Sequence, residues 1–340
     1  MASSSVLKND IVISTRIRLA RNVEGLISPN YMNEVSGGEG KRFAERVYEV
    51  VSEVGEFELM YMSGISDLYC RALTDRHFIS SALVRNKVAG AVIMNEEEGL
   101  SVMVNEEDHL RLQCILEGMR LSEAYEKLNV IDDVLIGNLN IAYDRRYGFV
   151  TSCLTNIGTG MRASAMLFLP ALTIMGYIDE NAKLLGSRGF EMRGTYGEGS
   201  ETVGFMYQVS NRISIGKTEK EIISDVEDAV DTLVIAEENA RTELLKGSVA
   251  ELKDTIMRSL GVMKFAYMMS EDEFIKRFCY VKLGIALGFV SVADLRGFDK
   301  LPDESRDAPL LMMTDRDMTE KELMIFRAEF VKNRLKSVLM

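Results

Sequence analysis

The sequence predicts an α+β fold, with an antiparallel sheet flanked by helices and followed by a small all-helical domain. Two observations indicate this. Strand-like and helical patterns are interleaved over the first two-thirds of the chain, and two of the strands are joined by the short acidic turn 96–99. After about residue 241 only helical patterns follow. We therefore expect an N-terminal tail at 1–10, an α+β domain at 11–241 and a helical domain at 250–340.

Strands are expected where apolar and polar residues alternate, or where short apolar runs end in turn residues. These stretches are 10–21, 89–95, 100–105, 147–153 and 201–211. Helices are expected where apolar residues recur every three or four positions. In the first domain these are 41–54, 109–128 and the segment after Thr218, where Glu221 completes a capping box. In the second domain, Ser270 and Thr319 precede helical patterns as N-caps.

The composition excludes several classes of protein. The 340 residues are 47% hydrophobic and 27% charged, which is typical of a globular protein, and no apolar run is long enough to predict a membrane span. The N-terminus has no secretion signal, and the four cysteines are widely spaced, so we expect reduced thiols and a cytoplasmic protein. Only two histidines are present, which disfavours a structural zinc or a Ser-His-Asp hydrolase.

The net charge of −12 also points to the kind of ligand. An acidic chain is not expected to bind nucleic acid directly through a diffuse basic face. If the protein binds an anion, its arginines must be gathered locally against the overall field. An acidic surface suits a cationic substrate.

The segment STRIR (14–18) lies within the first expected strand. Because side chains alternate along a strand, Ser14, Arg16 and Arg18 project to one side. Two arginines on one face repel each other unless an anion or a carboxylate lies between them. The motif predicts an anion site, but a solvent-facing strand with salt bridges fits it equally well.

Three further segments carry polar groups. In NEEDHLR (105–111), Glu107 and Arg111 would share a helix face, although acids at a helix N-terminus explain the same pattern. TSCLTNIGTGMRAS (151–164) is rich in glycine and threonine but lacks the G-x-x-x-x-G-K-[ST] pattern of a phosphate loop. RGTYGEGSE (193–201) is a glycine-rich loop that could also be a surface hairpin. His77 is isolated, and a lone histidine is usually structural.

Taken together, these segments predict one site. They contribute arginines with planar, bidentate donors, which polyphosphate recognition requires when no Walker lysine is present. The arginines are Arg16, Arg18, Arg111, Arg162 and Arg193. Two isolated glutamates, Glu107 and Glu198, and Cys153 accompany them.

STRIR, NEEDHLR, CLTNIGTGMRAS and RGTYGE, in this order, resemble the signature segments of the phosphagen (guanidino) kinase family. The resemblance covers roughly residues 10–241. Within the family the chain is most similar to the bacterial protein arginine kinases. It begins almost directly at STRIR, so we expect the N-terminal helical domain of the small-guanidine kinases to be missing, and a helical C-terminal domain is appended.

The resemblance implies an ATP-dependent kinase that phosphorylates arginine side chains in proteins, with Mg²⁺ bridging the ATP phosphates. It implies that Glu107 is the general base, that Glu198 is a second carboxylate on the guanidinium, and that Cys153 is a reactive cysteine near the acceptor. No metal-ligating residues are expected. The positions matching nucleotide binding in the family are Ser14, Thr15, Arg16, Ile17, Arg18, His77, Arg111, Arg162, Ala163, Ser164, Ala165, Met166, Arg193, Gly194, Thr195, Tyr196, Gly197 and Glu198.

The resemblance further implies a homodimer, a heat-shock repressor among the substrates, a zinc-containing activator and a Clp ATPase as partners, and a role in stress response and protein degradation. Two departures from the family pattern stand out. Leu154 replaces a usual proline, and Leu323 and Met324 replace the Arg-Asp of a phosphoarginine-binding motif in the tail, of which Arg327 and Ala328 survive. A free-arginine kinase and a non-catalytic adaptor are the alternative functions.

Overall fold

The computed structural model describes residues 10–29, 37–194, 204–247, 249–314 and 317–340. They form two compact units. The first comprises Met1–Leu167, Ala182–Met192 and Gln208–Thr232, and the second comprises Phe168–Asn181, Arg193–Tyr207 and Leu233–Met340. The units interleave along the chain, so the boundary expected between 241 and 250 stays a prediction.

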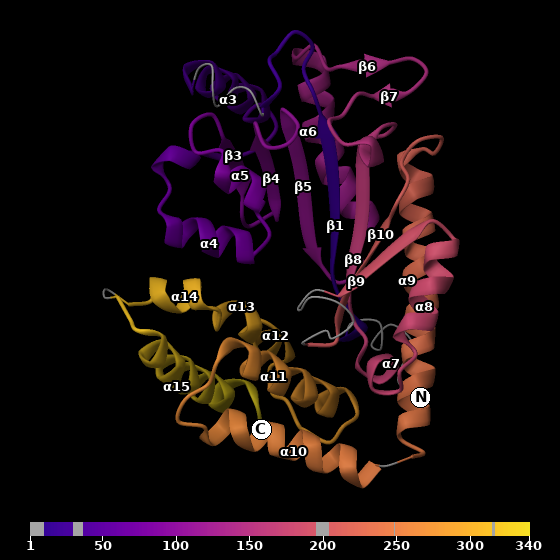
Figure 1. The fold of residues 1–340 in the computed structure, drawn as a ribbon, viewed down its shortest axis with the longest axis vertical. Coiled ribbons are helices and arrows are strands. Elements are labelled where there is room, and N and C mark those ends of the chain that lie inside the picture. Colours follow the sequence, from indigo (N-terminus) through magenta and orange to yellow (C-terminus); the bar gives the residue numbers. More distant parts are fainter. Residues whose placement is uncertain (1–9, 30–36, 195–203, 248, 315–316) are drawn as a thin grey trace. The chain divides into compact units, whose positions relative to one another are not determined.

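The first unit is built around an eight-stranded sheet with strand order β2-β3-β4-β5-β1-β8-β10-β9 (Figure 1). The strands are β1 Val12–Arg21, β2 Glu58–Tyr61, β3 Ala91–Asn95, β4 Leu100–Val104, β5 Leu110–Glu117, β8 Met161–Phe168, β9 Phe190–Gly194 and β10 Met206–Asn211. A separate two-stranded sheet pairs β6 Tyr143–Asp144 with β7 Gly148–Phe149. Pairing is antiparallel from β2 through β3, β4, β5 and β1 to β8, which confirms the predicted fold class.

The helices of the first unit differ in length and in what they cover. They are α3 Gly37–Val51, α4 Asp67–Asp75, α5 Ser81–Arg85, α6 Leu121–Asn138 and the short η1 Met62–Gly64 and η2 Leu154–Asn156. Helix α6 packs on β5 and β1, and α3 packs on α6 and β3. On the other side of β3 and β4, residues of α4 and α5 share a buried core with Val92, Met94 and Met103. The rest of that second face, over β5, β1 and β8, carries the polar side chains of the candidate site.

Strand β1 shows why the two faces differ. Thr15, Ile17 and Leu19 are buried, whereas Ser14, Arg16 and Arg18 are half-buried. Thr15 Oγ1 accepts a hydrogen bond from the backbone of Arg120 at the start of α6, so the buried set faces that helix. The alternation read from the sequence is therefore confirmed, and the arginines lie on the opposite face.

Two further expected segments of the first unit differ in the structure. The helix expected over 109–128 is wrong: residues 110–117 form β5, and α6 begins only at Leu121. Every second residue of this stretch is buried, namely Leu110, Leu112, Cys114 and Leu116. This period of two is that of a strand. Of the expected strand 147–153, only Gly148–Phe149 pairs, because the following residues are held by side chains rather than by a neighbouring strand.

From residue 233 onward, the described residues of the second unit form helices joined by short connections. Its complete helices are α7 Pro170–Ile174, α10 Val249–Phe265, α11 Glu271–Ala286, α12 Leu295–Asp299, α13 Leu301–Glu304, α14 Asp307–Met312 and α15 Glu320–Val338, and α8 Ile178–Ser187 and α9 Glu219–Leu244 straddle the two units. Helix α10 packs on α11 and α15. Ser270 and Thr319 cap α11 and α15, and Thr218 and Glu221 form the capping box before α9, as the sequence predicts. Among the described helices, none has the length and apolar character needed to cross a bilayer.

Candidate active site

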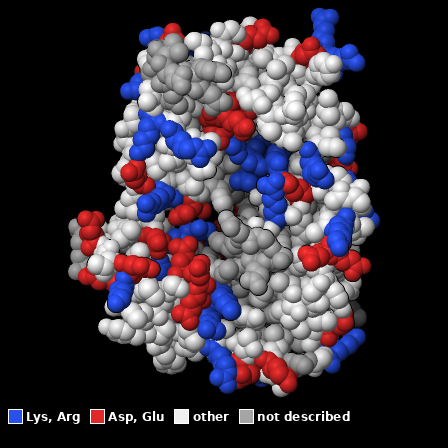
Figure 2. Space-filling view, viewed as in Figure 1, with Lys and Arg blue, Asp and Glu red and all other residues white. Residues whose placement is uncertain are grey.

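Four arginines from three neighbouring strands meet on the open face of the sheet. In the pairing register, Arg18 lies opposite Arg162 on β8 and opposite Gln113 on β5, and Ala20 lies opposite Arg111. Cross-strand partners are only about 5 Å apart at Cβ. In the upper half of Figure 2, Lys and Arg side chains gather in a hollow, with Asp and Glu side chains at its border. The register therefore places Arg16, Arg18, Arg111 and Arg162 close together on one face of the sheet, as the sequence predicts.

The arginines repel one another. Burial, followed by the charges of Arg111 and Arg162, lowers the pKa of Arg16 to about 10. Burial and the charges of the other three arginines lower the pKa of Arg18 well below its ordinary value, and Glu106 only partly offsets this. Clustered cations on one face of a sheet are destabilising unless a counter-charge is present. The cluster is therefore poised for an anion with several negative charges.

Existing contacts leave part of this cluster unsatisfied. Arg16 donates to Gln208 Oε1 at 3.1 Å, Arg111 to Glu106 Oε1 at 2.7 Å, and Arg162 to Glu191 Oε2 at 2.5 Å. Arg18 has no hydrogen-bond or ion-pair partner within the described part of the chain, and its buried Nε is unsatisfied. Buried donors without partners are rare in folded proteins, so Arg18 is the residue that most clearly lacks a ligand.

A pocket of about 230 Å³ opens beside Arg16 and Arg111. Its wall includes His77, Gln113 and the end of α4. His77 adopts a positive φ of 62°, which directs its carbonyl to accept a hydrogen bond from Gln113 Nε2 at 2.5 Å. A left-handed backbone at a non-glycine residue is uncommon and is often found at functional sites. His77 is exposed and lines the same pocket as the arginines, as predicted.

The acidic loop between β4 and β5 carries Glu107. Residues 105–109 form a bend rather than a helix start, so the expected helix face shared by Glu107 and Arg111 is wrong, and Arg111 instead pairs with Glu106. Glu106 is buried and also accepts from Ser80 Oγ and from the Glu107 amide. Glu107 itself is exposed. Partial desolvation and the charges of Glu106 and Asp108 raise the pKa of its carboxyl, and Arg111 opposes this.

Asp108 ties this loop to the one that carries Cys153. Its Oδ1 accepts hydrogen bonds from the Ser152 amide at 2.6 Å and from Asn22 Nδ2 at 2.7 Å. Asn22 Oδ1 in turn accepts from the His109 amide at 2.8 Å. The loop bearing the candidate base and the loop bearing the candidate cysteine are thus fixed to each other through a buried carboxylate.

Cys153 is the only partly exposed cysteine, and the other three are buried. Its Sγ lies 3.0 Å from Thr155 Oγ1, and its carbonyl accepts a hydrogen bond from the Thr151 hydroxyl. Leu154, which replaces the usual proline, is 83% exposed, so its side chain supports no packing in the loop. Loop rigidity must come from the surrounding hydrogen bonds instead.

Two glycines let this loop pack closely on its neighbours. Gly160 has φ +67°, and a Cβ there would lie 2.6 Å from Ala20 O and 2.4 Å from Arg21 Nη1. Gly158 has φ +113°, and a Cβ would lie 2.7 Å from the backbone of residues 214–215. These glycines are therefore required by the protein's own backbone packing.

Arg21 anchors the same region from beneath. It is buried, forms a two-pronged ion pair with Asp132 of α6 (2.9 and 2.6 Å), and donates to Thr159 O at 3.0 Å. Its guanidinium also stacks on Phe149, 3.5 Å from the ring centroid. Arg21 is thus a structural residue that holds the loop against α6.

The remaining predicted positions divide into three groups. Thr15, Ile17, Ala163 and Ala165 have buried side chains that face away from the arginines, so they hold the sheet rather than line the site. Ser164 and Met166 lie on the arginine side of β8, and Arg193 and Gly194 are exposed at the end of β9. Thr195, Tyr196, Gly197 and Glu198 lie outside the described residues.

Sequence reasoning missed the polar residues that support the arginines and the loops around them. They are Ser80, Glu106, Asp108, Gln113, Glu191 and Gln208. Glu106 and Asp108 stand in the motif itself, but nothing in a run of three acids says which are buried. Glu191 and Gln208 come from strands β9 and β10, whose neighbours only the sheet order reveals.

The altered segment in the tail lies on α15 of the second unit. Leu323 is buried, and Arg327 is 2% exposed. The Arg327 guanidinium donates to Ser305 O at 2.8 Å, to Met269 O at 3.1 Å and to the Asp307 carboxylate. The surviving arginine therefore links α15 to the segments before α11 and α14 as a buried structural contact.

Comparisons with known proteins agree with this geometry. Residues 40–240 match the family model described as the ATP:guanido phosphotransferase C-terminal catalytic domain, and residues 249–339 match the protein-arginine kinase McsB C-terminal domain. A lombricine kinase structure shares the fold with a TM-score of 0.58 at 24% identity, over 68% of this chain and 67% of that one. A taurocyamine kinase from Schistosoma mansoni gives a TM-score of 0.60 at 24% identity, over 76% and 39%.

An antiparallel sheet that presents an arginine cluster beside an acidic loop is thus the catalytic domain of a guanidino phosphotransferase. Relatives that match nearly the full length of the chain show which guanidino phosphotransferases it is most similar to. The protein-arginine kinase of Halothermothrix orenii is 37% identical, over 96% of this chain and 94% of the relative, and that of Caldanaerobacter subterraneus is 38% identical, over 96% and 97%. The chain belongs to the protein-arginine kinase family.

Proposed function

We propose that this protein transfers the γ-phosphoryl group of ATP to arginine side chains of other proteins. The observation that supports it best is the arginine cluster, in which Arg18 has no partner among the described residues. A nucleotide polyphosphate supplies the several negative charges and the planar oxygen acceptors that these guanidinium groups lack. Mg²⁺ bound to the phosphates would neutralise further charge as the phosphoryl group moves.

The acceptor chemistry fits the acidic loop. A guanidinium has no free lone pair at neutral pH, so it must lose a proton as its nitrogen attacks phosphorus. The P–O bond to ADP breaks, the N–P bond forms, and Glu107 accepts the proton. A positioned base of this kind contributes on the order of 10²–10⁴ in rate. Cys153 and Glu198 are proposed to orient the guanidinium beside it.

The raised pKa of Glu107 has a definite consequence for pH dependence. A general base works only when deprotonated, so activity is present above the pKa of Glu107 and is lost as the pH falls through it. Because that pKa lies above the ordinary 4.5, the acidic limb of the kcat profile is expected at a higher pH than for a free carboxylate. Glu107→Gln should remove the activity and not merely shift the limb.

The cellular setting is also proposed. A phosphorylated arginine changes from a cation into an anion, which suits a signal that detaches a DNA-binding heat-shock repressor or marks a protein for degradation. We propose a cytoplasmic homodimer that acts in the stress response, with a zinc-containing activator and a Clp ATPase as partners. Support for this comes from the family resemblance.

The function is tested by incubating the protein with ATP, Mg²⁺ and either a basic protein or free arginine, and measuring acid-labile phosphoramidate. Phosphate on the protein and none on free arginine is the expected result. Glu107→Gln should abolish transfer, while Glu97→Gln, an exposed glutamate in the β3–β4 turn, should leave it unchanged. Transfer to free arginine alone would make the protein a small-molecule kinase, and ATP binding without transfer to either acceptor would make it an adaptor.

A further inference from the structure

Among the described strands, β2 (Glu58–Tyr61) is the end strand of the eight-stranded sheet and pairs only with β3. The ladder continues with the Met62 amide donating to Gly90 O at 3.0 Å. Because bonding positions alternate in an antiparallel pair, Met60 bonds inward and the backbone groups of Leu59 and Tyr61 face the free edge. An open edge of this kind is a template for another strand.

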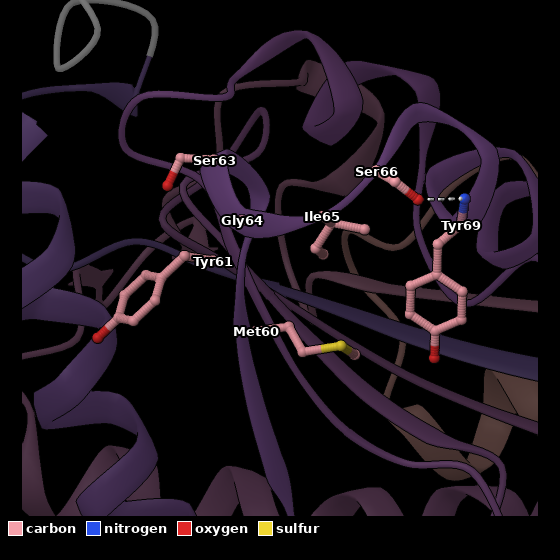
Figure 3. A pocket seen from close by; sticks show the side chains of 7 residues that line it. All are labelled: Met60, Tyr61, Ser63, Gly64, Ile65, Ser66 and Tyr69. Atoms are coloured by element: carbon pink, nitrogen blue, oxygen red, sulfur yellow. Dashed lines mark hydrogen bonds between the residues drawn. The ribbon is translucent and has the colours of Figure 1, made fainter.

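A hollow of about 510 Å³ lies beside this edge. It is lined by Met60, Tyr61, Ser63, Gly64, Ile65, Ser66 and Tyr69. In Figure 3 the rings of Tyr61 and Tyr69 lie on opposite sides of the hollow, with Met60 and Ile65 between them. An extended chain beside β2 would place successive side chains alternately toward Tyr61 and toward Tyr69.

The hydroxyl group of each tyrosine is hydrogen-bonded to the carboxylate of a glutamate. Tyr61 Oη donates to Glu45 Oε1 at 3.0 Å, and Tyr69 Oη donates to Glu96 Oε1 at 3.4 Å. Desolvation and these carboxylates raise the pKa of both phenols, which keeps them neutral donors. An aromatic face next to a carboxylate favours a cationic side chain.

The surroundings of β2 are acidic. Glu58 at the start of β2 and Glu53 and Glu56 in the segment before it are exposed, and none of them forms an ion pair with any described residue. Glu45 has no ion-pair partner among those residues either. Basic groups are present too: Arg76 pairs with Glu96 at 2.8 Å, and Lys41 lies 5.5 Å from the centre of the Tyr61 ring. Glu58 on the strand itself, and Glu45 bonded to Tyr61, leave negative charge beside this edge, which complements a basic strand.

We propose that the free edge of β2 and the adjoining hollow dock an extended, basic segment of the protein substrate by strand addition. The proposal rests on the proposed function, because it supplies a protein acceptor with a second contact outside the catalytic cluster. Main-chain hydrogen bonds to Leu59 and Tyr61 would provide affinity without a fixed sequence, and the carboxylates of Glu45 and Glu58, which have no ion-pair partner among the described residues, would select lysine or arginine.

The sheet order sets the spacing that such docking requires. A strand added outside β2 would lie five strand spacings from β1, and at about 4.8 Å each they amount to roughly 24 Å. An extended chain covers about 3.3 Å per residue, so roughly seven residues or more would separate the docked segment from an arginine held over β1. Substrates with basic residues at that separation are expected to be preferred.

The kinetic test uses the full-length protein. In Leu59→Pro the edge loses the outward N–H while the β2–β3 ladder keeps its bonds; Leu59→Ala, which retains the N–H, is the matched control. Glu58→Arg reverses one charge at the edge, and Glu126→Arg, at an exposed position of α6, is its control. Leu59→Pro and Glu58→Arg should raise KM for a disordered basic protein about five- to tenfold and leave kcat unchanged, and neither should affect capped Gly-Arg-Gly. Equal KM values for Leu59→Pro and Leu59→Ala would overturn the proposal, with the kinase function intact.

A binding test separates failure of docking from failure of the kinase function. A labelled peptide of alternating lysine and valine contains no arginine and cannot be phosphorylated. Fluorescence anisotropy should show that it binds wild type and Leu59→Ala and binds Leu59→Pro at least fivefold more weakly. Equal binding to all three, or to none, would overturn the docking site whatever the kinase assay shows.

Discussion

Replacing Arg16 by methionine is expected to stabilise the ligand-free protein and to weaken ATP binding. The pKa of Arg16 falls well below its ordinary value, to about 10, because of burial and two neighbouring arginines. At 1.36 kcal/mol per pKa unit, keeping this group charged in the folded state costs about 3 kcal/mol. Methionine retains much of the apolar stem but loses the hydrogen bond to Gln208, which contributes about 1 kcal/mol. The net gain in the free energy of unfolding is about 2 kcal/mol.

The pH dependence gives this prediction a second signature. The folded-state pKa of Arg16 is depressed, so the full cost is present below about pH 10 and falls progressively as the pH rises from that value toward the ordinary pKa of a free arginine. The stability difference between Arg16→Met and wild type should therefore shrink in strongly alkaline buffer. Arg18→Met should be stabilising in the same direction, because Arg18 has no partner to lose within the described chain.

Urea unfolding with and without Mg-ATP measures both effects. A ligand present at 100 times its Kd stabilises the folded state by about 2.7 kcal/mol, so saturating ATP should reverse the order of stability of wild type and Arg16→Met. Arg188→Met, at an exposed site, is the matched control and should change stability by less than about 0.5 kcal/mol. If Arg16→Met unfolds at lower urea than wild type without nucleotide, the repulsion argument is wrong.

Three further outcomes follow from the loops and the tail. Alkylation is expected to modify Cys153 first and to stop catalysis, with protection by ATP, because the other cysteines are buried; peptide mapping checks this, and lack of ATP protection would place Cys153 elsewhere than assigned. Asp108→Asn should lower kcat at least tenfold with little change in the Kd for ATP, since it weakens the tie to the Ser152 amide; stopped-flow and nucleotide titration separate the two, and a change in Kd alone would contradict it. Arg327→Met should destabilise the second unit by about 2–4 kcal/mol, because the carbonyl groups of Ser305 and Met269 lose their buried donor; wild-type thermal unfolding would refute the structural role.

The fold class and the arginine positions could be predicted because they rest on local periodicity. Strand β1 alternates cleanly, so the side on which Arg16 and Arg18 project follows from the sequence. The stretch 109–128 shows the limit. Its apolar residues fit a helix window, and only pairing with β1 and β4 selects a strand for its first half.

The site was predictable as a set of residue types but not as a set of contacts. Glu191 and Gln208 support Arg162 and Arg16 from strands β9 and β10, and only the sheet order brings those strands near β8 and β1. The glycine-rich composition of the cysteine loop does not say what its glycines do. In the structure, Gly158 and Gly160 are required by the backbone that packs against them.

The acidic loop shows how tertiary structure divides identical chemistry among adjacent positions. Glu106 is buried against Arg111 and Ser80, and Asp108 is buried against the Ser152 amide, so both carboxylates are occupied as acceptors. Glu107, between them, projects outward with its pKa raised by partial desolvation and by these two neighbours. The flanking acids therefore both fix the loop and make the central carboxylate a better proton acceptor. This division of roles accounts for three consecutive acids, and removing either flanking charge should lower the pKa of Glu107 as well as loosen the loop.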